Sequence, residues 1–483
     1  MTTPLNTPHP TTPTAPPPAN AATQQTPADE TQTLSVPPPA RTRAGIRYAV
    51  LSVSHALIDT FPILFVVLNL PLKQRLGLSA FEVELVYAIT PIFSGTLQPL
   101  FAWISDRFNT RIFSPLGLAI GAVCIGSIGF AQTFQQLIAL QILGVIATGF
   151  YHPVSTALAG QTGARAFTGG RAFAVGLFIA AGMVGQALSS YLTPKLIDTA
   201  GMTAIAWYII PAVLFAIVLH QVIRHIPHRA PDHETITQTL PKRENIQRWL
   251  VVASLCIQNC LRFICNIGLF AMFNVWAGSK IITNNHAALS ETELALAIDN
   301  ADTEGSKLAG TLIAAITVGM GLSVILSGRL IKHGHERLWL SALSFIGAAV
   351  VASLGYAGDA ILPGAGYNQN PGLIQILPLA AIAALAPIGF FSTFPIAASL
   401  GQRLQPRHTS LVMSLLMGIG WASSASAPFL AHLFLGESVK DAFLLPPEDI
   451  NRAFLGFAAL LVAAGLLAAT MPPRVIASVA DDH

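Results

Sequence analysis

The sequence predicts an all-α integral membrane protein with twelve transmembrane helices in two pseudo-symmetric six-helix bundles. Of its 483 residues, 53% are hydrophobic and only 10% are charged, whereas soluble globular chains carry about 25% charged residues. From residue 46 onward, apolar stretches follow one another at about the length of 20 residues that a helix needs to cross a bilayer. A long polar connection near the middle divides these stretches into two sets of six.

Residues 1–44 are predicted to form a disordered, Pro/Thr-rich cytoplasmic tail. The first 40 residues contain 11 Pro and 10 Thr, no Lys or Arg, and no apolar run. Such a composition cannot bury enough apolar surface to offset the entropy lost on ordering. A signal peptide needs a basic start and an apolar segment, so the first helix is expected to act as an uncleaved signal anchor.

Twelve helices are expected after this tail. Residues 85–105 and 308–328 are each 21 residues long and uncharged, which marks two of them clearly. The uncharged stretch 112–164 is divided at a cluster of three glutamines around residue 135. The expected helices cover about 46–71, 83–105, 112–131, 136–159, 171–193, 202–223, 249–276, 306–328, 338–357, 373–400, 408–434 and 452–471.

The distribution of Lys and Arg among the loops predicts the orientation. With the N-terminus inside, the cytoplasmic segments hold 18 of the 26 basic residues and the outer segments hold seven. Cytoplasmic loops of membrane proteins carry an excess of positive charge. We therefore expect both termini to be cytoplasmic, in a multi-pass protein of the cell (inner) membrane.

The longest polar connection, residues 224–248, is a predicted cytoplasmic linker. It separates an N-terminal bundle over 45–223 from a C-terminal bundle over 249–473, which a cytoplasmic tail over 474–483 follows. An outer insertion at about 278–305 carries five acidic residues and can form a short surface helix, to which we assign no chemistry. Two related halves are what a transporter needs when it rocks around a substrate held between them.

The loop between the second and third expected helices carries a recognisable motif. It reads Ala-Trp-Ile-Ser-Asp-Arg-Phe-Asn-Thr-Arg over residues 102–111. This resembles the cytoplasmic signature of the major facilitator superfamily, Gly-x-x-x-Asp-Arg-x-Gly-x-Arg, with Ala102 and Asn109 in place of glycines. In such a loop Asp106, Arg107 and Arg111 can pair with a neighbouring helix and gate the inner side; the alternative is a solvated turn that obeys the charge rule.

Four further motifs narrow the resemblance to the fosmidomycin-resistance-like branch of that superfamily. They are a His and an Asp in helix 1, a Gly-Phe-Tyr-His-Pro sequence ending helix 4, a glycine motif in helix 5 and an Arg in helix 7. The residues concerned are His55, Asp59, His152, Gly182, Gly185 and Arg262. The resemblance covers about residues 46–475 and implies the major facilitator fold and export of fosmidomycin-like solutes.

Charge and spacing indicate the same positions in helices 1 and 7, independently of the family resemblance. Away from the ends of the expected spans, Asp59 and Arg262 are the two strong charges, and a charge at bilayer depth costs several kcal/mol unless it is compensated. His55 precedes Asp59 by four residues, so both lie on one helix face. A carboxylate beside an imidazole suits proton transfer. The alternatives are a structural Asp59–Arg262 ion pair and a His55 that only hydrogen-bonds a neighbour.

Three more polar residues are candidates for the central cavity. His152 precedes a proline that frees a backbone carbonyl, and it can either carry protons or only accompany a kink. Asn266 lies one turn beyond Arg262, and Gln141 shares a face with His152. We expect Arg262, Asn266 and Gln141 to bind substrate, but the two amides can equally be hydrogen-bonding links between helices.

These observations predict a secondary active transporter, most simply a proton-coupled exporter (antiporter) of a small anionic or amphipathic solute. One alternative is a proton symporter or facilitator that takes up a small metabolite, and another is a transport-inactive membrane sensor or scaffold. The sequence shows no nucleotide-binding loop, nucleophile triad or metal-ligand cluster. We therefore expect no enzymatic activity, cofactor, metal or nucleic-acid partner, and a monomer whose partners are lipid, substrate and protons.

Overall fold

The computed structural model is helical throughout the residues that it describes. These are 38–108, 111–167, 170–224, 241–282, 289–330, 334–362, 372–405, 408–436 and 442–479. Most of the expected N-terminal tail and of the expected linker lies outside them, and so do the last four residues.

The N-terminal half contains six long helical segments, the first of which is interrupted. α1 ends at Asp59, and a turn over 60–63 separates it from the short α2. The helices are α1 (Pro38–Asp59), α2 (Leu64–Val67), α3 (Asn69–Leu76), α4 (Ala80–Arg107), α5 (Phe113–Gly126), α6 (Phe134–Ala166), α7 (Gly170–Ala200) and α8 (Ile209–Ile223), with 3₁₀ turns η1 (Ile128–Phe130) and η2 (Met202–Tyr208).

The C-terminal half repeats this plan with more interruptions. The helices are α9 (Lys242–Ile281), α10 (Glu291–Leu330), α11 (Glu336–Ile361), α12 (Leu373–Leu385), α13 (Thr393–Leu404), α14 (Thr409–Ser414), α15 (Gly420–Ser423), α16 (Ala427–Leu435), α17 (Pro447–Ala469) and α18 (Pro473–Ala477). A π-helical turn over Leu415–Ile419 joins α14 to α15, and short 3₁₀ turns lie at Ala386–Ile388, Ser424–Ser426 and Ala442–Leu444.

The described residues hold ten helices that are long and apolar enough to cross a membrane, or eleven if the bent segment 411–435 is one span. α4 supplies the twelfth. Its 28 residues reach about 40 Å at 1.5 Å per residue, and residues 85–105 within it carry no charge. The result is the predicted fold of two six-helix bundles.

Several boundaries differ from the sequence-based expectation. α9 begins at Lys242 and so includes the last part of the expected linker. α10 begins at Glu291 and therefore absorbs half of the expected outer insertion as a continuous extension of the helix. Ser290 begins this extension, since its backbone N–H donates to Glu293 Oε2 at 2.9 Å and the Glu293 N–H donates back to Ser290 Oγ.

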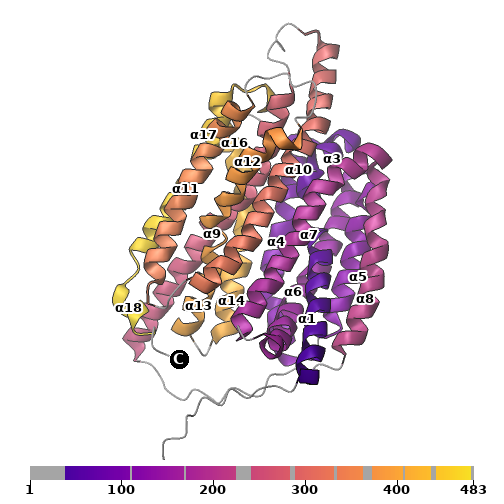
Figure 1. Ribbon diagram of the computed structural model, residues 1–483. Helices are drawn as coiled ribbons and strands as arrows, with labels where there is room; N and C mark the ends of the chain where they lie inside the picture. The colour runs from indigo at the N-terminus through magenta and orange to yellow at the C-terminus, as the bar shows by residue number, and fades with distance from the viewer. Residues whose placement is uncertain are drawn as a thin grey trace, which may run out of the picture.

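The two bundles stand side by side, the N-terminal one in indigo to magenta and the C-terminal one in orange to yellow (Figure 1). α7 packs along α10, and α4 packs against the segment from α14 to α16. Glycines make the first contact close, because a side chain on Gly310 of α10 would collide with the backbone carbonyl of Ser190 on α7. Small residues allow such close approach of membrane helices.

Polar bridges join the bundles at the upper end in Figure 1, where α3 and the start of α10 lie. Lys307 Nζ of α10 lies 2.8 Å from a carboxylate oxygen of Asp198 on α7. Asn274 Nδ2 of α9 donates to Tyr87 Oη of α4 at 3.1 Å, and Gln74 of α3 bonds Asp299 of α10. These contacts hold the upper ends of the bundles together.

An ion pair inside the C-terminal bundle ties α9 to α11. Lys280 Nζ lies 2.5 Å from Asp359 Oδ1, and the lysine side chain is buried. The same carboxylate also accepts from Trp276 Nε1 and Asn451 Nδ2. The sequence placed Lys280 in an outer loop, but α9 extends far enough to bury it.

We expect Asp359→Asn to lower the free energy of unfolding by about 2–4 kcal/mol, because it leaves the buried Lys280 ammonium without its anion. Asp449→Asn is the matched control, since Asp449 pairs at 3.0 Å with an exposed Arg452, and exposed pairs contribute about 1 kcal/mol or less. Thermal unfolding in detergent measures both. Equal shifts for the two variants would contradict a stabilising role for the buried pair.

Candidate functional site

The candidate site lies where α1 ends. Asp59 is the last residue of α1, and it is buried with only 4% of its surface exposed. His55, one turn earlier on the same helix, is also buried, and its Nε2 lies 3.5 Å from Asp59 Oδ2. The sequence-predicted pair therefore forms a continuous buried face of α1.

α6 brings a second imidazole to the carboxylate. His152 Nε2 lies 3.5 Å from Asp59 Oδ1, and a quarter of its side chain is exposed. The neighbouring Tyr151 exchanges a 2.6 Å hydrogen bond with Ser54 of α1, so α6 is fixed against α1 at this level. The structure thus gathers His55, Asp59 and His152, which the sequence assigned to proton coupling, into one cluster.

α7 supplies the remaining hydrogen-bond partners of His55 and Asp59. His55 Nδ1 lies 2.6 Å from the Phe178 carbonyl oxygen, and the two rings stack with centroids 4.1 Å apart. Gln186 Nε2 donates to Asp59 Oδ2 at 3.2 Å. Each face of the carboxylate therefore has a named neighbour on α1, α6 or α7.

The predicted glycine motif explains how α7 comes so close. A Cβ on Gly182 would lie 2.7 Å from His55 Cε1 and would also collide with Asp59, while a Cβ on Gly185 would overlap the backbone of Ala56. Any larger residue at either position would push α1 and α7 apart. In this structure the motif serves the packing around the buried carboxylate.

The chemistry of the cluster follows from its lone pairs. A carbonyl oxygen only accepts, so the His55 Nδ1 that faces Phe178 carries a proton. In the neutral ring, Nε2 therefore carries a lone pair that faces a carboxylate oxygen of Asp59. A proton between these two atoms is favourable, because both are acceptors. His55, Asp59 and His152 each offer one proton-accepting atom, and these atoms lie within 4.8 Å of one another, so one proton can be shared among them.

Arg262 lies outside the Asp59 cluster. It is fully buried in the C-terminal bundle, where Nη2 donates to Gln258 Oε1 at 3.3 Å, Leu340 O at 3.4 Å and Ser344 Oγ at 3.0 Å. The structure does not pair it with Asp59, whose charged neighbours are the two histidines. Among the described residues its Nε and Nη1 have no acceptor.

The two amides expected at a substrate site have different surroundings. Gln141 Nε2 donates to Val86 O at 2.7 Å and to Thr90 Oγ1 at 3.0 Å, so it links α6 to α4. Asn266 is buried one turn beyond Arg262, and neither side-chain atom has a partner among the described residues. Gln141 thus makes the helix-linking contact that was its alternative interpretation.

The predicted gate is described only in part. Asp106 and Arg107 lie at the end of α4, and their side chains are outside the described residues, as is the backbone of residues 109–110. Arg111 Nη1 donates at 2.8 Å to the carbonyl of Arg224, the residue that follows α8. This contact links Arg111 to the end of α8, and the gating role of the three residues remains a prediction.

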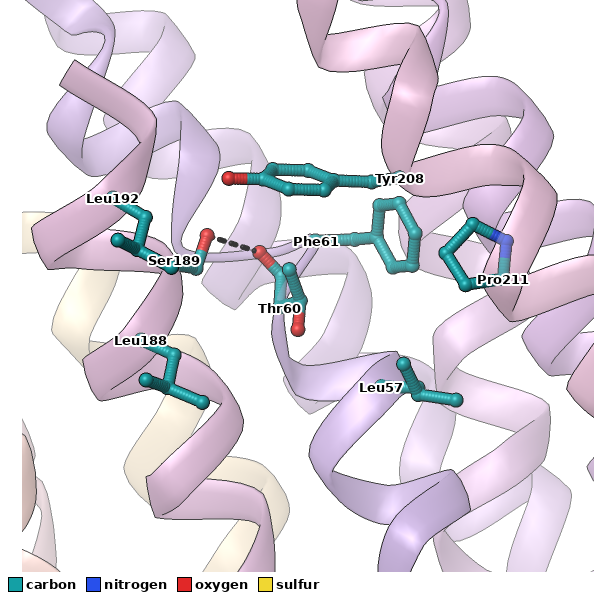
Figure 2. Close-up of a pocket in the computed structure, with 8 residues that line it drawn as sticks. All are labelled: Leu57, Thr60, Phe61, Leu188, Ser189, Leu192, Tyr208 and Pro211. Atoms are coloured by element: carbon teal, nitrogen blue, oxygen red, sulfur yellow. Dashed lines mark hydrogen bonds between the residues drawn. The ribbon is translucent and has the colours of Figure 1, made fainter. Parts of the chain in front are cut away.

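A small pocket of about 170 Å³ lies near the break after α1. Figure 2 shows Ser189 of α7 donating to the Thr60 carbonyl, with the Tyr208 ring nearby. Leu188 and Leu192 at its edge are exposed, as is expected of a lipid-facing surface. The pocket is lined by Leu57, Thr60, Phe61, Leu188, Ser189, Leu192, Tyr208 and Pro211, and it does not include the charged cluster.

Sequence reasoning missed Gln186 and the Phe178 carbonyl. Gln186 lies in the same helix 5 motif as Gly182 and Gly185, so the signal was a polar residue four positions after a motif glycine. Positions separated by four residues share a helix face. The carbonyl carries no sequence signal, because every residue has one.

Comparison with known proteins gives consistent matches. A family model described as "Major Facilitator Superfamily" matches residues 50–428. The chain is 25% identical over 211 residues to the fosmidomycin resistance protein of Escherichia coli K12, across 42% of this chain and 50% of that protein. It is 22% identical over 178 residues to the uncharacterized MFS-type transporter YfnC of Bacillus subtilis 168, across 35% and 41%. The matches thus span half or less of these relatives.

Solved structures share the fold. A bacterial homologue of the human lysosomal transporter Spinster, inward-facing and unoccupied, has a TM-score of 0.57 at 15% identity, over 90% of this chain and 98% of that one. The human organic anion transporter MFSD10 has a TM-score of 0.54 at 16% identity, over 90% and 100%. Identities this low show the fold alone.

We expect Gly182→Ala to destabilise the protein by about 1–3 kcal/mol, because the added Cβ forces His55 and Asp59 to move. Gly176→Ala on the same helix is the control, since its Cβ would meet its nearest neighbour at 3.8 Å. Glycine within a helix costs about 0.5–1 kcal/mol relative to alanine, so this variant should be neutral or slightly stabilised. Melting temperatures of the two purified variants decide the point, and a stable Gly182→Ala would refute the steric argument.

Proposed function

The chain belongs to the major facilitator superfamily, and from this premise we propose that it is a proton-coupled secondary transporter that exports a small anionic or amphipathic solute. The family and its structural relatives are transporters rather than enzymes. The observation that carries the proposal is the buried cluster of Asp59, His55 and His152 at the end of α1.

The cluster is suited to binding and releasing one proton per cycle. A buried carboxylate without a cation is costly at bilayer depth, so the cluster holds a proton whenever it is closed to water. His152 is its most exposed member, and through it a proton can reach the carboxylate. Because α1, α6 and α7 all contribute, loss of the proton changes the contacts that hold these helices together.

The upper polar bridges and the predicted lower gate fit alternating access. We place the upper end of Figure 1 outside and both termini in the cytoplasm, which follows the distribution of basic residues. The bridges made by Lys307, Asn274 and Gln74 then close the outer side. Asp106, Arg107 and Arg111 are proposed to hold the inner side shut in the opposite state.

Two observations support an anionic solute. Arg262 and Asn266 form a buried polar pair in the C-terminal bundle without a carboxylate partner among the described residues, and a bound anion would supply the missing charge. The Escherichia coli relative is named for resistance to fosmidomycin. A phosphonate of that kind suits arginine, whose planar fork can donate two parallel hydrogen bonds.

We expect Asp59→Asn to abolish accumulation driven by a pH gradient while exchange of substrate without a gradient continues. Asparagine keeps the size of aspartate but cannot carry the proton. The measurement uses proteoliposomes with an imposed gradient of either direction and a panel of labelled anions, and the direction that drives flux also separates export from uptake. Asp449→Asn, in the exposed Arg452 pair, is the control. Undiminished gradient-driven transport by Asp59→Asn would remove the cluster from this role.

We expect Arg262→Lys to weaken binding of an anionic substrate by about 1–3 kcal/mol, the range for a hydrogen bond to a charged group, because lysine keeps the charge but loses the fork. Arg262→Gln should weaken it further. Affinity is measured on purified protein beside the melting temperature, with Arg452→Gln as a control at an exposed arginine. If Arg262→Gln binds with native affinity, Arg262 is a structural residue only.

A further inference from the structure

We propose that Gln186 is a positioning residue that sets the pH at which the Asp59 cluster releases its proton. It does so by donating a hydrogen bond to the charged form of the carboxylate. This inference rests on the proposed proton site and adds a residue on α7 that neither motif spacing nor family resemblance assigned to it.

The distances single out Gln186 among the neighbours of Asp59. Its Nε2 lies 3.2 Å from Asp59 Oδ2, whereas the nearest nitrogens of His55 and His152 lie 3.5 Å from the carboxylate oxygens. N–H···O hydrogen bonds have donor–acceptor distances up to about 3.2 Å. Gln186 is therefore the side chain that hydrogen-bonds Asp59 within the described part of the chain.

The bond favours one protonation state. An amide N–H donates and cannot accept, so it stabilises the carboxylate more than it stabilises the acid. His55 Nε2 faces the same oxygen, Oδ2, and its other nitrogen is held by the Phe178 carbonyl. A proton on Asp59 can therefore donate to the lone pair of His55 Nε2, and release of this proton leaves a carboxylate that accepts from Gln186.

Few ionisable groups surround Asp59, so the effect of the neutral Gln186 amide on proton release can be measured. His55 faces Asp59 from its own helix, and His152 and Tyr151 face it from α6. α7 contributes the Gln186 amide and the Phe178 carbonyl, neither of which titrates. Replacing Gln186 thus changes a hydrogen bond without changing the charge of the site.

The test replaces Gln186 with methionine, which has a similar shape and no donor. Without its donor the carboxylate is less stabilised, so we expect the pH of half-maximal gradient-driven transport to rise by about one unit. The pH dependence of the melting temperature should move in the same direction, and it needs no substrate. Gln405→Met is the matched control, because Gln405 is a buried amide in the C-terminal bundle that donates to Asn245 of α9 at 3.0 Å. It should lower the melting temperature and leave both pH midpoints unchanged.

A second variant keeps the inference testable if Gln186→Met folds poorly. Gln186→Glu keeps the length of the side chain and puts a second carboxylate beside Asp59, so both midpoints should rise further. Midpoints within 0.2 unit of the unmodified protein, roughly the precision needed to resolve a one-unit shift, would overturn the inference whether or not the melting temperature falls. Failure of the proposed function itself would appear separately, as gradient-driven transport by Asp59→Asn.

Discussion

A carboxylate cannot stay at bilayer depth without partners, and the N-terminal bundle is organised around this requirement at Asp59. Three helices meet the requirement together. α1 supplies His55, α6 supplies His152, and α7 supplies the Gln186 amide and the carbonyl that holds His55. Desolvation of a charged group is costly enough that these contacts fix the relative positions of all three helices.

The same requirement explains the small residues of α7. Contact with α1 is possible only because Gly182 and Gly185 leave room for the imidazole, the carboxylate and the backbone of Ala56. Further along α7, Ser190 and Pro194 lie against Gly310 of α10 in the opposite bundle. One helix therefore contacts both the charged cluster and the interface between the bundles. A change at Asp59 that moves α7 would reach that interface directly.

The C-terminal bundle handles its buried charges differently. Lys280 and Asp359 neutralise each other between α9 and α11, and Trp276 and Asn451 donate further hydrogen bonds to the carboxylate. Arg262 donates only to neutral oxygens within the described residues, and all three hydrogen bonds come from Nη2. The two halves share an architecture, but the first gathers titratable groups around an acid whereas the second buries a cation that lacks a matching anion among the described residues.

The sequence by itself determined the membrane class, the two halves and most helices, because hydrophobic length is a local property that the bilayer thickness fixes. It also identified His55, Asp59 and His152, since ionisable residues in apolar helices are rare and costly.

The sequence could not determine that His152 reaches Asp59 while Arg262 does not. That choice depends on the rotation and packing of helices far apart in the chain. Nor could it reveal Gln186 or the Phe178 carbonyl as partners, or the burial of Lys280. Only tertiary structure decides which face of a helix meets which neighbour, because close packing, and not hydropathy, sets those distances.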